Sequence, residues 1–297
     1  MEKTWPEQFY RYLEIEKRYS PHTLNAYRRD LKDFISFCDR GNLASLVDIS
    51  AHNIRQYIAD TNKRKLSAKT IQRRLSVVRS FFRYLEKESH LTSNPAEVVK
   101  APKVPRHLPK AIDVDQVQVL LNISDTDELA IRDIAMLELF YSSGLRLSEL
   151  VSLNISDLEL QEKQIRVTGK GNKMRITPVG KYAVKALQRW FELRKQWVDE
   201  NEQAVFVTQK GTRISQRSVQ ARLKAWGEKQ MLNSGLHPHR LRHSFASHLL
   251  ESSGDIRAVQ ELLGHENLSS TQIYTHLDFQ YLAKVYDSAH PRAKKTK

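Results

Sequence analysis

The sequence has very little cysteine and no long apolar run. Of its 297 residues only Cys38 is a cysteine, so no intramolecular disulfide can form. No stretch approaches 18 consecutive apolar residues, and the opening MEKTWPEQFYRYLEIEKRYS lacks an apolar segment of signal-peptide length. These absences argue against a disulfide scaffold, a membrane protein and a secreted protein. We expect a cytoplasmic protein that does not associate with membranes.

Acidic residues are also in deficit. There are 34 Asp and Glu against 48 Lys and Arg, which gives a formal net charge of +14. The excess is concentrated in residues 1–110, which carry 22 basic and 12 acidic residues. A surface this basic attracts polyanions, nucleic acid more readily than an anionic membrane. The N-terminal third is therefore expected to grip nucleic acid most strongly.

Proline is scarce outside one segment, NPAEVVKAPKVPRHLPK, at residues 94–110. A segment so rich in proline forms neither a long helix nor a central strand. We interpret it as a semi-extended linker between a helical domain at residues 1–93 and a second domain at residues 111–297. Its basic residues could let the two domains clamp a duplex from opposite sides.

Apolar residues recur at helical spacing in four segments before this linker. The spacing predicts helices over residues 5–18, from Pro21 to near Gly41, and after Ser50 and Ser67. The last helix carries basic residues around its apolar stripe, and four of them are predicted to contact DNA: Lys69, Arg73, Arg74 and Arg79. The alternative is a solvated charged face.

The second domain is predicted to be mainly helical with a small antiparallel sheet, an α+β fold. Helices are expected from Asp113 and over residues 132–141, 145–150, 184–193 and 215–226. Two alternating runs, residues 164–168 and 174–179, predict a β-hairpin around the turn GKGNK. A short apolar strand at residues 204–207 is expected to join the sheet of this hairpin.

The segment HPHRLRHSFASHLL predicts a helix from about His239 to Leu250. His239 and Arg242 then lie one turn apart on the same face. A helix over residues 255–263 follows, closed by Gly264, with His265 in the turn. A final pair of short helices is expected to carry Tyr274 and then residues 277–286.

These residues have the chemistry of phosphodiester transfer. Such a reaction needs a nucleophile, positive charge on the non-bridging oxygens, and a proton for the leaving 5′ oxygen. Arg146 and Arg242 offer planar forks suited to phosphate, and His265 can donate a further hydrogen bond. For Arg146 the local alternative is an ion pair with Glu149, three residues later.

The nucleophile and its proton partners are the remaining candidates. The phenol of Tyr274 has a pKa of about 10 when free, so it needs nearby cations and a base to attack at neutral pH. His239 is the candidate base, and Lys170 in the hairpin turn is the candidate acid for the leaving oxygen. A lysine at a hairpin tip is otherwise simply solvated.

The segments that carry these six residues are GLRLSEL, TGKGNK, HPHRLRHSFASHLL, LLGH and TQIYTH. In order and spacing they resemble the catalytic set of tyrosine site-specific recombinases, the phage integrase family. All six positions are filled. The linker and the ending YTHLDFQYLAKVYDSAHPRAKK resemble the Xer subfamily.

The resemblance implies a SAM-like core-binding domain and a catalytic domain that close as a C-shaped clamp around double-stranded DNA. It implies a 3′-phosphotyrosyl intermediate and a Holliday junction, with no cofactor, metal or ATP. It further implies a heterotetramer with a second, XerD-like recombinase, a dif-type site at which chromosome dimers are resolved, and control by a septal DNA translocase. Residues 277–290 would pack into a neighbouring protomer.

Three other functions are open to the same residues. A metal-dependent nuclease could use the histidines His237, His239, His243 and His248, but the HExxH pattern and nearby carboxylates are missing and Arg242 would repel a cation. A type IB topoisomerase shares the tyrosine chemistry but acts as a monomer without strand exchange. A protein of this fold that only binds DNA would not need Tyr274.

Overall fold

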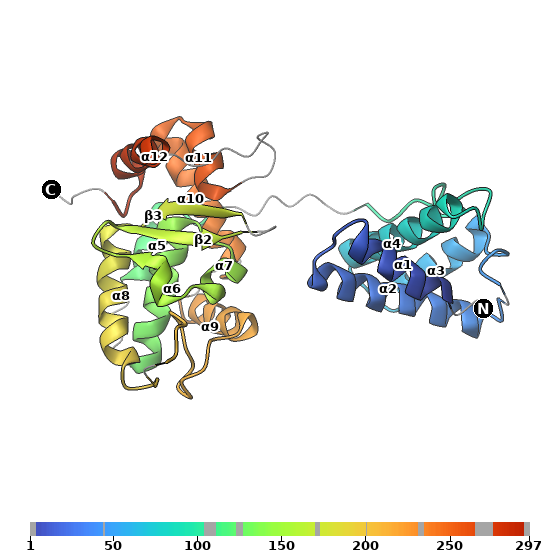
Figure 1. Ribbon diagram of the computed structural model, residues 1–297, viewed down its shortest axis with the longest axis horizontal. Helices are drawn as coiled ribbons and strands as arrows, with labels where there is room; N and C mark the ends of the chain where they lie inside the picture. The colour runs from blue at the N-terminus through green and yellow to red at the C-terminus, as the bar shows by residue number, and fades with distance from the viewer. Residues whose placement is uncertain are drawn as a thin grey trace. The chain divides into compact units, whose positions relative to one another are not determined.

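The computed structural model describes residues 4–43, 45–103, 111–122, 127–169, 173–199, 201–230, 235–264 and 276–293, the side chains of 276–280 excepted. The chain divides into two compact units, Met1–His107 and Leu108–Lys297 (Figure 1). Within the described residues, no helix is both long and apolar enough to cross a membrane.

The first unit is helical. Its elements are α1 (Thr4–Ile15), α2 (Pro21–Arg40), α3 (Ala51–Lys63) and α4 (Ala68–Lys87). Three of these helices begin where the sequence predicts, because the hydroxyls of Ser20, Ser50 and Ser67 each accept a backbone N–H of the first turn. Aromatic side chains fill the space between the helices, with Phe9 and Phe81 fully buried and packed edge to face.

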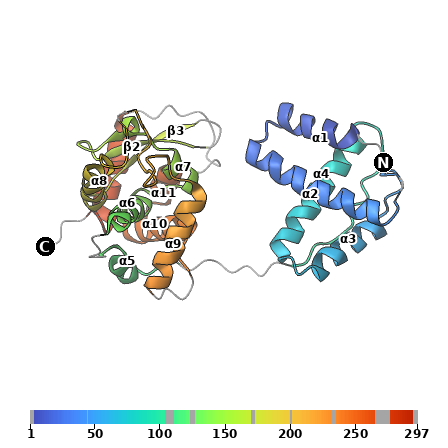
Figure 2. The same ribbon diagram turned by 90° about the horizontal axis from the view of Figure 1, so that it is seen from below.

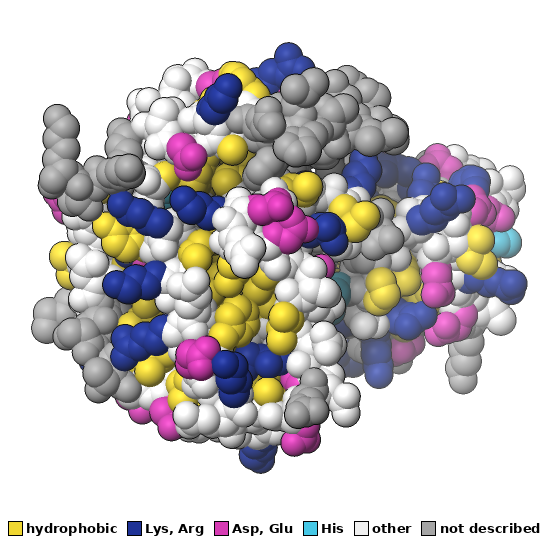
Figure 3. Space-filling model, turned by 60° about the vertical axis from the view of Figure 1, so that its left-hand side comes forward, with side chains coloured by type: hydrophobic (Ala, Val, Ile, Leu, Met, Phe, Trp, Pro, Cys, Tyr) yellow, Lys and Arg dark blue, Asp and Glu magenta, His cyan; other side chains and the backbone are white. Residues whose placement is uncertain are grey.

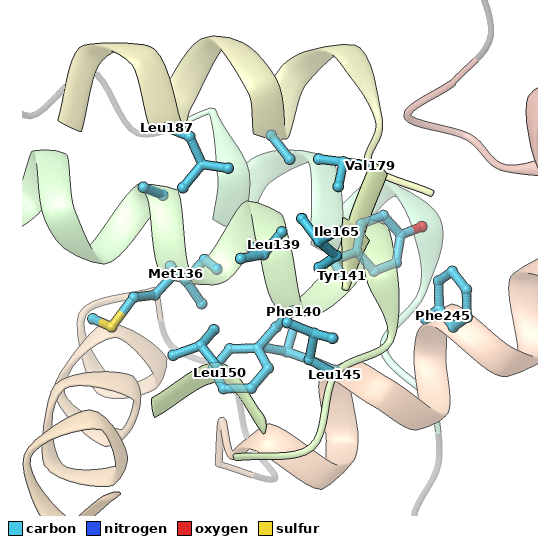
Figure 4. Close-up of a cluster of buried hydrophobic side chains, with 14 of the residues drawn as sticks. Met136, Leu139, Phe140, Tyr141, Leu145, Leu150, Ile165, Val179, Leu187 and Phe245 are labelled. Atoms are coloured by element: carbon cyan, nitrogen blue, oxygen red, sulfur yellow. The ribbon is translucent and has the colours of Figure 1, made fainter. Parts of the chain in front are cut away.

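The second unit adds eight α-helices and a 3-10 helix, η1 (Ile155–Asp157), in the residues described. The α-helices are α5 (Val114–Leu121), α6 (Glu128–Ser143), α7 (Leu147–Ser152), α8 (Lys181–Arg194), α9 (Gln216–Lys229), α10 (Pro238–Ser253), α11 (Ile256–Leu263) and α12 (His276–Ala289). Helix α6 is buried along nearly its whole length and lies at the centre of the unit, beside α8 and α10 (Figures 1 and 2). Its side chains meet Leu187 of α8 and Phe245 of α10 in the core (Figure 4).

The sheet is small and antiparallel, in the order β1 (Leu158–Glu159), β2 (Gln164–Thr168) and β3 (Met174–Pro178). Thr168 pairs with Met174 at the turn end of the β2–β3 hairpin, and Gln164 pairs with Pro178 at its open end. The predicted hairpin is therefore confirmed. Lys170, between the two strands in the sequence, lies outside the described residues.

The predicted strand at residues 204–207 is wrong. This stretch makes only isolated bridges, Ala204 with Asn154 and Val207 with Arg213, and the third strand of the sheet is β1 instead. Side chains of α8 bind two carbonyls of this stretch, since Trp190 Nε1 donates to that of Val205 at 2.9 Å and Arg194 Nε to that of Ala204 at 3.0 Å. Carbonyls bound in this way do not need a sheet partner.

The end of the chain packs on its own unit. Helix α12 contacts α10, α11 and β3, and its Leu282 and Tyr286 are buried. The Tyr286 hydroxyl lies 3.0 Å from that of Ser142 at the end of α6. In the single chain, the segment that the family resemblance assigns to a neighbouring protomer thus completes its own core.

Candidate active site

The site begins at the turn between α6 and α7. Gly144 ends α6 in the left-handed conformation, with φ +58°. A Cβ at this position would lie 2.5 Å from Cδ1 of Phe245, so only glycine lets α10 approach so closely. The turn then places Arg146 at the N-terminus of α7.

Arg146 makes the local ion pair and reaches beyond it. Its backbone N–H donates to Glu149 Oε2 at 2.7 Å and its Nη1 to Oε1 at 2.8 Å. Its Nη2 donates to the carbonyl of Gly264 at 3.1 Å. The side chain is still 34% exposed, so part of it is accessible to a ligand. The ion-pair interpretation and the phosphate interpretation are therefore compatible.

Glu149 is buried at the centre of three arginines, Arg146, Arg175 and Arg242. Its side chain is 2% exposed, and its two oxygens accept hydrogen bonds from Arg146 and Arg175. Burial by itself raises the pKa of Glu149, but the hydrogen bonds and charge of Arg175, and then the hydrogen bonds of Arg146, lower it to about 2. The carboxylate is therefore ionised at neutral pH.

Arg242 approaches the same carboxylate from α10. Its Nη1 donates to the carbonyl of Gly144 at 2.5 Å and lies 3.8 Å from Glu149 Oε2, while its Nη2 donates to the carbonyl of Leu263 at 2.5 Å. Burial, followed by the charge of Arg146, lowers the pKa of Arg242 to about 9. The guanidinium thus keeps its charge at neutral pH.

The last carbonyls of α11 join these arginines together. Leu262, Leu263 and Gly264 accept hydrogen bonds from Arg175, Arg242 and Arg146, respectively. Carbonyls at a helix C-terminus have no partner within the helix and carry partial negative charge, so they suit cations. The chain is therefore held in place immediately before His265.

The remaining predicted site residues stand as follows. His239 lies in the first turn of α10 and is exposed, whereas Arg242, three residues later, is buried. Lys170, His265 and Tyr274 lie outside the described residues. The structure thus brings together Arg146 and Arg242, and the catalytic roles of all six residues stay predictions.

Sequence reasoning missed Arg175 and saw in Glu149 only a local partner of Arg146. A signal for Arg175 was present. Side chains alternate along a strand, and Arg175 shares the buried face of β3 with Thr177. A charged residue at an inward position needs a buried partner of opposite charge.

Three of the four basic residues proposed to contact DNA from α4 have partners inside the first unit. Arg73 pairs with the buried Asp30, and Arg74 pairs with Asp33. The Nε of Arg79 donates to the carbonyl of Ala96 at 3.1 Å. Lys69 is exposed. Contact of these four residues with DNA stays a prediction.

Charged residues of both signs are visible on one face of the molecule (Figure 3), and residues that can bind metals occur across the part of the chain that the structure describes. On the face drawn in Figure 3, Lys and Arg side chains are interspersed with hydrophobic and acidic ones. Across the same described residues, His, Cys, Asp and Glu form no group of three or more that could hold a metal ion.

The second unit is thus a mainly helical domain with a small sheet, in which Arg146, Arg175 and Arg242 gather around the carboxylate of Glu149. Residues 110–281 match the family model described as "Phage integrase family", and residues 7–89 match "Phage integrase, N-terminal SAM-like domain". The chain belongs to the phage integrase family.

Individual relatives make the class more specific. The chain is 52% identical to Tyrosine recombinase XerC of Shigella flexneri over 98% of its own length and 97% of the relative. It is 51% identical to Tyrosine recombinase XerC of Escherichia coli O157:H7 over the same shares. The chain is a tyrosine recombinase, an enzyme that cleaves and rejoins DNA.

Among solved structures, the XerH site-specific recombinase bound to a palindromic difH substrate matches with a TM-score of 0.68. The match covers 88% of this chain and 78% of that chain at 23% identity. At this identity the match supports the fold alone, and it confirms the predicted α+β class.

Proposed function

We propose that this recombinase exchanges DNA strands with Tyr274 as its nucleophile. The other members of the catalytic set are Arg146, Lys170, His239, Arg242 and His265. The observation that supports this assignment is the convergence of two arginines from distant elements on one carboxylate and on the end of α11. Such preorganised cations are what a phosphoryl transition state requires.

The arginines hold the scissile phosphate in this mechanism. Arg146 is partly exposed, and the buried Arg242 is fixed by two backbone carbonyls. Their charges stabilise the negative charge that gathers on the non-bridging oxygens. His265, which follows the anchored Gly264 in the chain, donates a further hydrogen bond to the phosphate.

The covalent step needs no external reagent. The Tyr274 oxygen attacks phosphorus, His239 takes the phenolic proton, and the bond to the 5′ oxygen breaks. Lys170 gives a proton to that oxygen, so the products are a 3′-phosphotyrosyl bond and a free 5′ hydroxyl. Attack by a 5′ hydroxyl from another strand reverses these steps and rejoins the DNA. The bond energy is conserved, so ATP is not required.

The biological reaction that we infer is recombination at a dif-type site through a Holliday junction, which resolves chromosome dimers before division. Support comes from the identity with proteins named XerC over nearly the whole chain. Residues 1–93 would bind the core site, residues 94–110 would link, and residues 111–297 would cleave. A XerD-like recombinase would complete a heterotetramer in the cytoplasm, under control of a septal DNA translocase.

Covalent trapping on a library of nicked duplexes, with and without a XerD-like recombinase, tests this proposal. A nick in the cleaved strand, on the 3′ side of the cleavage position, lets the short fragment with the free 5′ hydroxyl diffuse away, so the phosphotyrosyl adduct accumulates. We expect adducts on dif-type sequences, in EDTA as well as without it, and strand exchange only when both recombinases are present. Relaxation of supercoiled DNA without any sequence preference would instead indicate topoisomerase-like activity.

A further inference from the structure

Arg175 is a buried charged residue to which the proposed mechanism gives no role. It lies on β3, opposite Val167 of β2, and its side chain is 6% exposed. Burying a guanidinium is costly unless its charge and its N–H groups are paired. The partners of Arg175 therefore indicate its role.

Its contacts lie on two other elements. Nη1 and Nη2 donate to the two oxygens of Glu149 at 2.7 and 2.9 Å, which makes a bidentate pair with the first turns of α7. Nε donates to the carbonyl of Leu262 at 3.1 Å, near the end of α11. A Cβ on Gly264 would lie 3.2 Å from Cδ of Arg175, so the arginine stem packs on that residue as well.

The pair matters because Glu149 is also within reach of both phosphate-binding candidates. Arg146 donates to it, and Nη1 of Arg242 lies 3.8 Å from it. An ionised carboxylate among three guanidiniums competes with a phosphate for their N–H groups. Arg175 supplies a bidentate partner and thereby reduces what Glu149 demands of the other two.

We infer that Arg175 is a positioning residue for DNA cleavage. It saturates Glu149, so that Arg146 and Arg242 can direct N–H groups to the scissile phosphate, and it holds the end of α11 before His265. The inference rests on the proposed function, because it assumes that these two arginines bind the phosphate. Arg175 itself does not touch the DNA.

Single-turnover cleavage of a nicked duplex at saturating enzyme tests this role, with DNA affinity measured separately. Arg175→Gln removes the bidentate partner, and the freed Glu149 then draws Arg146 and Arg242 toward itself. A misplacement of about 1 Å can cost about 100-fold in rate, so we expect a loss of that order with little change in DNA affinity. In a double variant that adds Glu149→Gln, the competing charge is gone, and we expect recovery of about tenfold over Arg175→Gln.

Arg166→Gln is the matched control. Arg166 lies on the neighbouring strand and pairs with Glu159 at 3.1 Å, but the two side chains are 47% and 40% exposed. Exposed pairs contribute little, so cleavage by this variant should equal that of the wild type. If Arg175→Gln does not fold, Arg175→Lys replaces it, since lysine keeps the stem and the charge but not the fork. We expect that variant to cleave about tenfold more slowly at unchanged affinity.

Two results would overturn the inference. One is wild-type cleavage by the Arg175 variant. The other is a double variant no faster than Arg175→Gln, which would mean that Arg175 only supports the fold. Arg146→Lys separates this inference from the proposed function. If Arg146→Lys cleaves at the wild-type rate, the assignment of the catalytic set is wrong. If Arg146→Lys cleaves slowly but Arg175→Lys cleaves at the wild-type rate, only the inference about Arg175 is wrong.

Discussion

The carbonyl oxygen of Gly264 accepts a 3.1 Å hydrogen bond from the guanidinium of Arg146, across 118 positions of the chain. Gly264 closes α11 in the left-handed conformation and immediately precedes His265. One predicted phosphate-binding residue thus holds the backbone beside another. The site is therefore assembled by tertiary structure. A change that moves one of the elements that carry it should disturb several of its residues at once.

Gly144 gives a test of that assembly. Gly144→Ala introduces a Cβ 2.5 Å from Phe245 and a side chain at φ +58°. The backbone conformation costs about 1–2 kcal/mol, and overpacking costs a further 1–3 kcal/mol or so. Gly254→Ala is the matched control, because Gly254 has φ +67° and nothing within 4 Å of the added Cβ. Urea unfolding should show the larger loss for Gly144→Ala, and equal losses would contradict the packing argument.

The residues that follow α12 are held by a buried ion pair between Arg292 and Glu138 of α6, in which the Arg292 Nε lies 3.3 Å from Glu138 Oε2. Arg292→Met leaves the carboxyl without its partner, so we expect the free energy of unfolding to fall by about 3–5 kcal/mol. The double variant with Glu138→Leu should regain most of that loss. Lys195→Met, which removes the exposed pair with Glu192, should change nothing measurable. A double variant as unstable as the single one would show that the pair does more than neutralise a buried charge.

His290 makes the stability of the catalytic unit depend on pH. The ring is buried, with Nε2 3.2 Å from the carbonyl of Tyr141 and Nδ1 accepting the backbone N–H of Arg292 at 3.2 Å. Burial lowers the pKa of His290 to about 3, from an ordinary 6.5. The unfolded chain therefore binds the extra proton first, and stability is lost as pH falls below 6.5.

The expected pH dependence of the free energy of unfolding is large enough to measure. One such proton is worth about 1.4 kcal/mol per pH unit between the two pKa values. Between pH 7 and pH 5 the free energy of unfolding should therefore fall more steeply for the wild type than for His290→Phe, which has no titrating ring at this position. Parallel curves would show that His290 does not titrate on unfolding in this range. The neighbouring His248 is present in both proteins and cancels in the comparison.

Local signals were enough to predict much of the fold. Ser20, Ser50 and Ser67 each precede an apolar helical pattern, and each caps a helix. Alternating residues around a glycine-rich turn identified the β2–β3 hairpin. These features depend on neighbours within a few residues, which the sequence displays directly.

Features that depend on distant partners could not be predicted in the same way. Residues 204–207 have the composition of a strand, but Trp190 and Arg194 of α8 bind the carbonyls of Val205 and Ala204. The Arg175–Glu149 pair joins residues 26 positions apart, and no local pattern specifies it. For the site, the sequence named Arg146 and Arg242 and paired Glu149 with Arg146, but it did not show that Arg175 and Arg242 reach the same carboxylate.

The most direct test of the account is whether Tyr274 forms the covalent bond to DNA. Tyr274→Phe removes only the phenolic oxygen, and Tyr281→Phe removes the same atom from an exposed tyrosine seven residues later. Both variants and the wild type are incubated with a nicked dif-type duplex and resolved on a denaturing gel. We predict that Tyr274→Phe binds the duplex without forming an adduct, while Tyr281→Phe forms it like the wild type. A protein–DNA adduct that survives in Tyr274→Phe would contradict the assignment of the nucleophile.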